Sequence, residues 1–326
     1  MRVVSGIQPT GKLHIGNYIG AIKQFVELQK NNECFFFIAN LHAITVPYDP
    51  KELKENTIDI LASYIALGIN PKKSTIFLQS QVKEHTELAW LLNAIVSVGE
   101  LQRMTQFKDK SQKLRKEFTS AGLLNYPILM AADILGYKAD VVPIGEDQKQ
   151  HLELTRNIAE KFNKRFKKVF KIPEPLIKEN GKRILSLVDP SKKMSKSLGD
   201  EHCLYIFENE KTMKEKIMKA VTDSGKEIIY NPEEKPGISN LIVIYSNFSN
   251  KIIKDVEKHF EGKTYEQLKK ELYELLKEKL AQFKARKNSL LKNKQDLLKI
   301  MDDGRKKAQK VISKTVREVK KAMGII

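Results

Sequence analysis

The stretch that decides the fold reads Ser5-Gly6-Ile7-Gln8-Pro9-Thr10-Gly11-Lys12-Leu13-His14-Ile15-Gly16-Asn17 and continues into Tyr18-Ile19-Gly20-Ala21. The apolar pair Val3-Val4 precedes it, and apolar residues at helical spacing follow it. This order predicts a strand, a glycine-rich turn and a helix, an arrangement that can present backbone N–H groups to a phosphate. His14 and Asn17 would be two neutral donors on one side of the first helical turn. An ordinary strand–helix loop fits the same residues, whereas the dinucleotide pattern G-x-G-x-x-G does not.

The composition limits the class of protein. A chain of 326 residues with 41% hydrophobic content predicts one large domain or two ordinary ones with a real core. The 58 Lys+Arg against 40 Asp+Glu give a net charge of +18, which favours nucleic acid, a phosphate-rich ligand or an anionic membrane as partner. A lysine-rich solvated surface would give the same charge.

Cysteine use and hydropathy point to a location. Cys34 and Cys203 are the only cysteines, too few for a disulfide framework or a cysteine-based zinc site. The first apolar run is too short for a signal peptide, and no apolar run approaches the roughly 18 residues of a membrane span. We therefore expect a cytoplasmic protein, although import into an organelle after loss of a leader would leave the same sequence.

Strand and helix patterns alternate through the first half of the chain. Short apolar runs predict strands at 34–39, 74–79 and 140–144, and helical spacing predicts helices at 51–67, 84–98, 123–135 and 149–166. This alternation predicts an α/β fold with a parallel sheet, in which ligands bind at the carboxyl ends of the strands. The glycine-rich segments 5–17 and 145–148 fall at such ends. Helix 84–98 is apolar nearly all round, which predicts burial in the core or in a subunit interface. The polar segment 105–120 reads as a mobile loop or frayed helix that partly covers the site.

The character of the chain changes after about residue 190. Residues 205–326 are mainly helical, and from residue 251 onward 22 Lys+Arg face 11 Asp+Glu. We expect three parts: an α/β domain at 1–189, a loop and linker at 190–204, and a smaller all-helical domain at 205–326 whose last helix can pack back on the α/β domain.

A second motif reads Val188-Asp189-Pro190-Ser191-Lys192-Lys193-Met194-Ser195-Lys196-Ser197. Its lysines, separated by small hydroxyl residues, could converge on a polyphosphate. Alone, the same stretch could be a basic linker.

Together, the two motifs are far more specific. Pro9 with His14-Ile15-Gly16-Asn17, and Lys193-Met194-Ser195-Lys196-Ser197, resemble the HIGH-type and KMSKS signatures of class I aminoacyl-tRNA synthetases. Further blocks are similar to bacterial tryptophanyl-tRNA synthetases: residues 5–11, 42–45, 99–108, 126–135, 145–151, 235–241 and 322–324. The resemblance implies a Rossmann-type catalytic domain, a small helical domain that reads the anticodon, and a homodimer.

The resemblance also implies a reaction. Tryptophan and ATP would give tryptophanyl-adenylate and pyrophosphate, and tryptophan would then pass to the 3′ end of tRNA(Trp). The implied catalytic groups are His14, Asn17, Lys193 and Lys196. The implied ATP contacts are Gln8, Pro9, Thr10, Gly16, Asn17, Gly145, Glu146, Asp147, Ile184, Lys193, Met194, Ser195, Lys196 and Ser197. Mg²⁺ would accompany ATP, mostly through phosphate oxygens and water.

Selection of the amino acid is predicted to rest on Asp133. A carboxylate on an apolar helix needs a partner, and an indole N–H, which only donates, is such a partner. Met130 would pack on the indole ring, and Tyr126 and Gln148 would bind the ammonium and carboxylate of tryptophan. Gln8 and His42 would be second contacts, although a buried tyrosine or histidine can equally be a satisfied core group.

Three rival interpretations remain open at this point. A tyrosyl-tRNA synthetase shares the fold and both signatures, a non-catalytic RNA-binding paralogue would need only the charge, and a small nucleotidylyltransferase shares the HIGH-like chemistry. Two departures from the family pattern stand out. Leu198-Gly199-Asp200 replaces a proline-containing turn, which questions the stiffness of the loop, and Val4 stands where a larger apolar residue is common.

Overall fold

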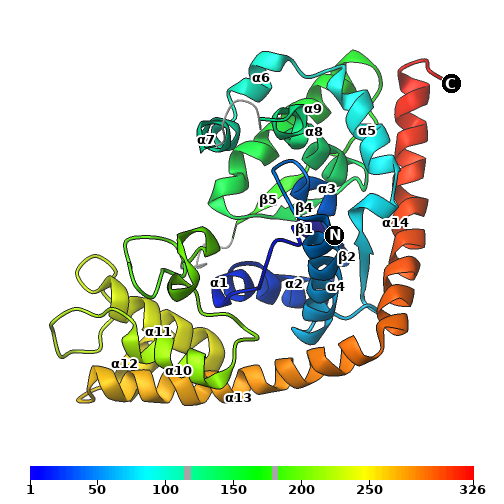
Figure 1. Ribbon diagram of the computed structural model, residues 1–326. Helices are drawn as coiled ribbons and strands as arrows, with labels where there is room; N and C mark the ends of the chain where they lie inside the picture. Colours follow the sequence, from blue (N-terminus) through cyan, green and yellow to red (C-terminus); the bar gives the residue numbers. More distant parts are fainter. Residues whose placement is uncertain (114–118, 178–182) are drawn as a thin grey trace. The chain divides into compact units, whose positions relative to one another are not determined.

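A five-stranded parallel sheet organises the first of two compact units in the computed structural model, which describes residues 1–113, 119–177 and 183–326 (Figure 1). The strands are β1 (Arg2–Ile7), β2 (Glu33–Ile38), β3 (Ser74–Leu78), β4 (Val141–Pro143) and β5 (Glu174–Leu176). Their order is β3-β2-β1-β4-β5. The chain moves outward from β1 through β2 to β3 and then crosses to the other side of β1, so the direction switches between β1 and β4. Ligands of open α/β sheets bind at this point.

The strands form where the sequence is continuously apolar. Residues 34–38 of β2 are all buried, as expected of a strand covered on both faces. The register pairs Gly6 of β1 with Phe37 of β2. A Cβ atom on Gly6 would lie 2.6 Å from the Phe37 ring, so glycine is needed there for the ring to pack. The predicted parallel α/β fold is confirmed. However, β1 continues through residues 5–7, which the sequence placed in the turn.

Helices of the first unit start at identifiable caps. Asp49 caps α4 (Pro50–Ala66) by accepting from the Glu52 N–H, and Ser120 caps α8 (Ala121–Leu135) by accepting from the Leu123 N–H. The remaining elements are α3 (Asn40–Ala43), η2 (Gln79–Gln81), α5 (Glu84–Asn93), α6 (Val98–Gln102), α7 (Thr105–Lys113), η4 (Glu146–Gln148), α9 (Lys149–Arg165) and α14 (Lys294–Ala322). These α4, α8 and α9 bounds match the predicted helices to within two residues.

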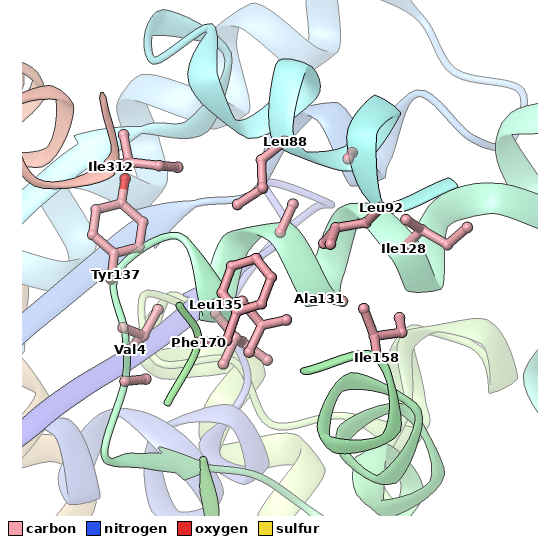
Figure 2. Close-up of a cluster of buried hydrophobic side chains, with 14 of the residues drawn as sticks. Val4, Leu88, Leu92, Ile128, Ala131, Leu135, Tyr137, Ile158, Phe170 and Ile312 are labelled. Atoms are coloured by element: carbon pink, nitrogen blue, oxygen red, sulfur yellow. The ribbon is translucent and has the colours of Figure 1, made fainter. Parts of the chain in front are cut away.

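The core of this unit lies where α5, α8 and α9 meet the sheet. Figure 2 shows Leu88, Ile128, Leu135 and Ile158 gathered there, and all four are buried. The C-terminal helix α14 joins the same cluster through Ile312 and packs along β3. A Cβ atom on Gly304 of α14 would lie 1.7 Å from the carbonyl oxygen of Ile76. Glycine therefore permits the close approach of α14 to the strand.

The second unit comprises residues 12–24 and the described residues 183–289. Its elements are α1 (Ile15–Asn17), η1 (Tyr18–Ile22), η5 (Lys196–Leu198), η6 (Asp200–His202), α10 (Glu210–Lys219), α11 (Pro236–Ser249) and α12 (Ile253–His259), with the starts of α2 (Lys23–Leu28) and α13 (Tyr265–Lys292). The Tyr18 ring lies 5.5 Å from the ring of Phe248 and 5.6 Å from that of Phe283. These contacts attach the short N-terminal segment to the helices of this unit. The compact units thus do not follow the boundaries at 189 and 205, which remain a prediction.

One local expectation needs correction, and two further segments take a definite form. The predicted helix 84–98 is split into α5 and α6, and Trp90 on α5 is 77% exposed, so burial in the core of this chain is wrong for that residue. Residues 105–113 form the helix α7, which agrees with the helical alternative for that segment, and Gln150 accepts from the N–H and hydroxyl of Thr105 at its start. The rest of segment 105–120 lies partly outside the described residues. Strand β5 had no counterpart in the sequence pattern.

In the parts of the chain that the structure describes, no helix has the length and apolarity to cross a membrane.

Candidate active site

The first signature begins a helix in the second unit. His14 is the N-cap residue of α1, and its backbone N–H donates to Oδ1 of Asn17 at 3.1 Å. The segment on either side is fixed by backbone bonds to residues 204–206, because Ile15 N–H donates to the Leu204 carbonyl and Ile206 N–H donates to the Leu13 carbonyl. The amide oxygen of Asn17 is thus committed to the helix start, which leaves its amide nitrogen as the donor.

The imidazole of His14 is held neutral. Burial, followed by the charges of Lys196 and Lys193, lowers the pKa of His14 to about 4. Its Nδ1 atom is buried and has no hydrogen-bond partner among the described residues. A Cβ atom on Gly16 would lie 2.9 Å from this Nδ1 atom and 3.6 Å from Cβ of Ile184. Gly16 therefore makes room for the histidine ring, and the predicted pair of neutral donors fits the geometry.

The second signature starts from a small antiparallel pairing. Met194 N–H donates to the Ile184 carbonyl and Ser186 N–H to the Lys192 carbonyl, both at 2.9 Å. Asn240 of α11 holds the backbone of Leu185 between them through its side-chain amide. Met194 is 1% exposed and anchors the loop, whereas Lys193 and Ser197 on either side of it are exposed. Burial lowers the pKa of Lys196.

The unusual turn after this loop is tied down by side chains. Gly199 has a φ of +125°, a conformation open mainly to glycine. The buried Ser186 hydroxyl lies 2.7 Å from Nδ1 of His202. Lys216 of α10 donates to carboxylate oxygens of Asp200 at 2.9 Å and Glu208 at 2.5 Å. Hydrogen bonds and an ion pair thus hold this turn in place of the proline that the family pattern has there.

In the first unit, two exposed segments lie at the switch point of the sheet. Gln8 and Thr10 follow β1 and are exposed, and so are Gly145, Glu146 and Asp147 after β4. Gln148 donates to the carboxylate of Asp147 at 2.9 Å, and Gln106 of α7 donates to the Asp147 carbonyl. A Cβ atom on Gly145 would lie 2.7 Å from Oδ1 of Asp147. The segment after β4 is thus ordered by its own side chains and by α7.

Asp133 lies at the centre of a buried polar cluster in this unit. Its side chain is 1% exposed, and its oxygens accept from Nε2 of His42 at 2.8 Å, Nε2 of Gln79 at 2.8 Å and Nδ1 of His85 at 2.6 Å. Burial alone would raise the pKa of Asp133, but the hydrogen bonds from His42 and His85 reverse this effect and lower it. The carboxylate is therefore ionised, and its charge is stabilised by the hydrogen bonds from these neighbours.

A second polar pair lies beside it. The Tyr126 hydroxyl is 2.6 Å from Nε2 of His151, and the Tyr126 ring meets the His42 ring edge-on at 6.2 Å. The ammonium of Lys110 lies 5.2 Å from the Tyr126 ring centre. Burial, with a smaller contribution from Lys110, lowers the pKa of His151 to about 4, and burial raises the pKa of Tyr126.

The structure brings together several of the residues that were predicted to bind tryptophan, and it adds others. His42 contacts both Asp133 and Tyr126, Met130 is half-buried against the core, and Gln148 lies after β4 next to Asp147. Sequence reasoning missed Gln79 and His85, which contact Asp133, Tyr137, which contacts His85, and His151, which contacts Tyr126. No local pattern in the sequence distinguishes these four residues. No group of three or more His, Cys, Asp or Glu residues suited to a metal ion occurs in residues 1–113, 119–177 and 183–326.

Comparison with known proteins identifies the class. Residues 1–281 match the family model for class I tRNA synthetases of the W and Y type. The chain is 52% identical to a tryptophan–tRNA ligase of Caldanaerobacter subterraneus subsp. tengcongensis over 100% of this chain and 98% of that protein. It is 48% identical to the Bacillus anthracis enzyme over 99% of this chain and 98% of that protein.

Solved structures agree with the sequence relatives. A tryptophanyl-tRNA synthetase from Mycoplasma pneumoniae superposes with a TM-score of 0.91 at 35% identity, covering 99% of this chain and 97% of that one. A Campylobacter jejuni synthetase, solved with ADP and tryptophan, gives 0.86 at 38% identity, covering 99% and 100%. The chain belongs to the class I tRNA synthetases. Within them, its full-length similarity is to the bacterial tryptophan–tRNA ligases, as the further blocks of similar sequence had indicated.

Proposed function

We propose that this protein activates L-tryptophan with ATP, releasing pyrophosphate, and then transfers tryptophan from the adenylate to the 3′ end of tRNA(Trp). The observation that carries the substrate assignment is Asp133, an ionised carboxylate 1% exposed and in contact with His42. A ring N–H is the kind of neutral donor that such an acceptor selects. Phenylalanine or leucine would leave it without that partner, a difference that can give roughly 10⁴–10⁵ discrimination.

Activation is an attack of the tryptophan carboxylate on the α-phosphate of ATP. The protein has to position the groups and stabilise charge. In the second unit, His14 and Asn17 donate to phosphate oxygens, because a neutral imidazole and a side-chain amide are available at the start of α1. Lys193 and Lys196 hold the β- and γ-phosphates and stabilise the departing pyrophosphate. Met194, Ser195 and Ser197 complete the loop of residues 193–197, called the lysine loop below.

Other ATP contacts follow from the same assignment. Gly16 and Ile184 would meet the adenine and ribose in the second unit. In the first unit, Gln8, Pro9, Thr10, Gly145, Glu146 and Asp147 would serve the nucleotide. Mg²⁺ would arrive with ATP, bound through phosphate oxygens and water. The described residues hold no ready-made group of metal ligands.

The amino acid would be held at both of its ends. Asp133 accepts from the indole N–H, with Met130 against the ring and His42 beside the carboxylate. Tyr126 and Gln148 bind the ammonium and carboxylate of tryptophan, with Gln8 as a second contact. The ordered position of the Tyr126 hydroxyl, 2.6 Å from Nε2 of His151, supports this role.

Partners of the protein remain proposals of the same kind. The basic helical segment from residue 251 onward suits tRNA, and reading of the anticodon by the helices of residues 205–326 follows from the family. A homodimer is supported by Trp90 and Val98, which are 77% and 59% exposed in the single chain. A cytoplasmic location is the expectation from the two cysteines, both of which are buried thiols.

Amino-acid-dependent ATP–pyrophosphate exchange tests the function. We expect exchange with tryptophan, and exchange with tyrosine lower by a factor of about 10³ or more. Exchange with tyrosine but not tryptophan would make the protein a tyrosyl enzyme. Absence of exchange with either amino acid would favour a non-catalytic tRNA-binding paralogue. Mass measurement in solution tests the dimer, and a monomer for the wild type would contradict it.

A further inference from the structure

The three donors to Asp133 differ in how deeply they are buried. Gln79, the first residue of η2, and His85, in the first turn of α5, are both completely buried, whereas His42 is 8% exposed. The Nε2 atom of Gln79 lies 2.8 Å from both carboxylate oxygens and thus bridges them. His85 contacts only Oδ1, at 2.6 Å. The two deeper donors fix the carboxylate from behind, and they are the groups that set its position.

Both nitrogens of His85 have partners. Nδ1 faces the carboxylate of Asp133, and Nε2 lies 2.8 Å from the hydroxyl of Tyr137. An ionised carboxylate only accepts, so Nδ1 must carry the proton. Burial and the nearby negative charges of Asp133 and Glu84 raise the pKa of Tyr137 well above its usual value, so Tyr137 keeps its proton and can donate it to Nε2. Every polar atom of the chain Tyr137–His85–Asp133 is then satisfied in one tautomer.

The imidazole also has little freedom to rotate. Its ring centre lies 5.5 Å from that of Tyr137, 5.8 Å from Phe77 and 6.0 Å from Phe37. Tyr137 is itself fully buried, and Figure 2 shows its ring beside Ile312 of α14. A Cβ atom on the neighbouring Gly136 would lie 2.6 Å from Ile312, which shows how closely α14 packs on this segment. Close packing therefore restricts the positions of both His85 and Tyr137.

We propose that Tyr137 and His85 form a positioning relay that fixes the tautomer of His85 and, through it, the direction in which Asp133 presents its carboxylate to the ring N–H of the amino acid. The inference rests on the proposed role of Asp133. It assigns selectivity for the substrate to two residues that need not touch it. Since the relay supports the acceptor and not the nucleotide, its loss raises the KM for tryptophan and leaves the KM for ATP nearly unchanged.

Three substitutions of His85 separate this role from packing. In His85→Asn, the amide nitrogen can occupy the place of Nδ1 and still donate to Asp133. In His85→Gln, the amide reaches the place of Nε2, next to Tyr137. Asp133 then loses the donor at the position of Nδ1 and keeps only those from His42 and Gln79. His85→Leu removes both contacts. Loss of a buried donor to a charged group changes binding by about tenfold or more.

The measurement is ATP–pyrophosphate exchange with tryptophan and with its benzothiophene analogue, which has sulfur in place of the ring N–H. We expect His85→Gln and His85→Leu to raise the KM for tryptophan at least about tenfold and to lower the preference for tryptophan over the analogue by a similar factor. His85→Asn should recover most of both. The KM for ATP should stay within about twofold in all three variants.

Tyr137→Phe keeps the volume of the ring and tests the relay even where the His85 variants fold poorly. We expect a severalfold rise in the KM for tryptophan with the melting temperature close to that of wild type. Equal effects of the Asn and Gln variants, parallel changes in both KM values, or an unchanged KM in Tyr137→Phe would each overturn the relay. Failure of the wild type to exchange with tryptophan would instead overturn the proposed function on which the relay rests.

Discussion

Nε2 of His42 lies 2.8 Å from Oδ2 of Asp133, and the His42 ring is also in edge-on contact with Tyr126. Residues from α3 and α8, 91 positions apart in the chain, thereby connect the proposed indole acceptor with the proposed ammonium ligand. His42 is the most accessible of the three donors to Asp133. We therefore expect its hydrogen bond, and not those of the other two, to change when an amino acid binds.

Replacement of Gly16 by alanine should damage the ATP site without unfolding the protein. The new Cβ atom would lie 2.9 Å from Nδ1 of His14 and displace the ring. We expect the kcat of ATP–pyrophosphate exchange to fall about 10–100-fold. Gly20→Ala is the matched control, because, apart from its chain neighbours and its own helix backbone, no atom of the described residues lies within 4 Å of its Cβ position. Equal activity of the two variants would refute the need for space beside His14.

Replacement of Lys196 in the second signature should reduce activity far more than replacement of the nearby Lys192. Lys196→Ala is expected to lower the kcat of activation by about 10²–10³-fold, since it removes charge stabilisation in the transition state, and to leave the KM for tryptophan within about twofold. Lys192→Ala should stay close to wild type, because the Lys192 ammonium is 2.9 Å from the Asp189 carboxylate and its side chain is 57% exposed. Comparable losses in the two variants would contradict the assignment of the lysines.

Acidification should destabilise the fold in part through His151. Its pKa is about 4 in the folded protein against an ordinary value of 6.5, so below pH 6.5 the unfolded chain binds more protons and stability falls toward pH 4. From pH 7 to pH 5 the expected contribution is about 1–2 kcal/mol. His151→Gln removes the titration and keeps a polar group near Tyr126. Urea unfolding at both values of pH should show a smaller loss in this variant, and an identical loss would argue against the lowered pKa.

Close packing of α14 on the sheet gives a prediction about stability. In Gly304→Ala the new Cβ atom would lie 1.7 Å from the backbone oxygen of Ile76, so the helix or the strand has to move. We expect a loss of about 3 kcal/mol or more in the free energy of unfolding. Gly122→Ala, where the nearest atom is 3.5 Å away, should instead be neutral or gain about 0.5–1 kcal/mol. A neutral Gly304→Ala would mean that α14 does not pack against β3 in this way.

Sequence patterns were sufficient for the regular part of the fold. Apolar runs located β2 and β3, and helical spacing located α4, α8 and α9, because these elements bury continuous surfaces that the chain encodes locally. They were insufficient for β5, which is three residues long and contains a proline, and for the break between α5 and α6. For Trp90 the sequence could not decide between the core and a subunit interface, since an apolar side chain has the same hydropathy at both places.

The candidate site divides in a similar way. His14, Asn17 and the lysine loop stood out because their order in the chain is distinctive, and Asp133 because it interrupts an apolar helix. The partners of Asp133 carry no such mark. Gln79, His85 and Tyr137 come from three separate segments, and only the packing of β3, α5 and α8 brings Gln79 and His85 to the carboxylate and Tyr137 to His85. Their role is a property of tertiary structure.

The acceptor role of Asp133 is tested by comparing tryptophan with its benzothiophene analogue in wild type and in Asp133→Ala, by kcat/KM for ATP–pyrophosphate exchange. Asp255→Ala, at an exposed helical carboxylate, serves as the control. If Asp133 accepts from the ring N–H, wild type and Asp255→Ala should prefer tryptophan by about 10² or more, and this preference should collapse toward unity in Asp133→Ala while the KM for ATP persists. A wild-type enzyme that uses both amino acids equally well, or an Asp133→Ala variant that keeps the full preference, would contradict the role of Asp133 as the acceptor.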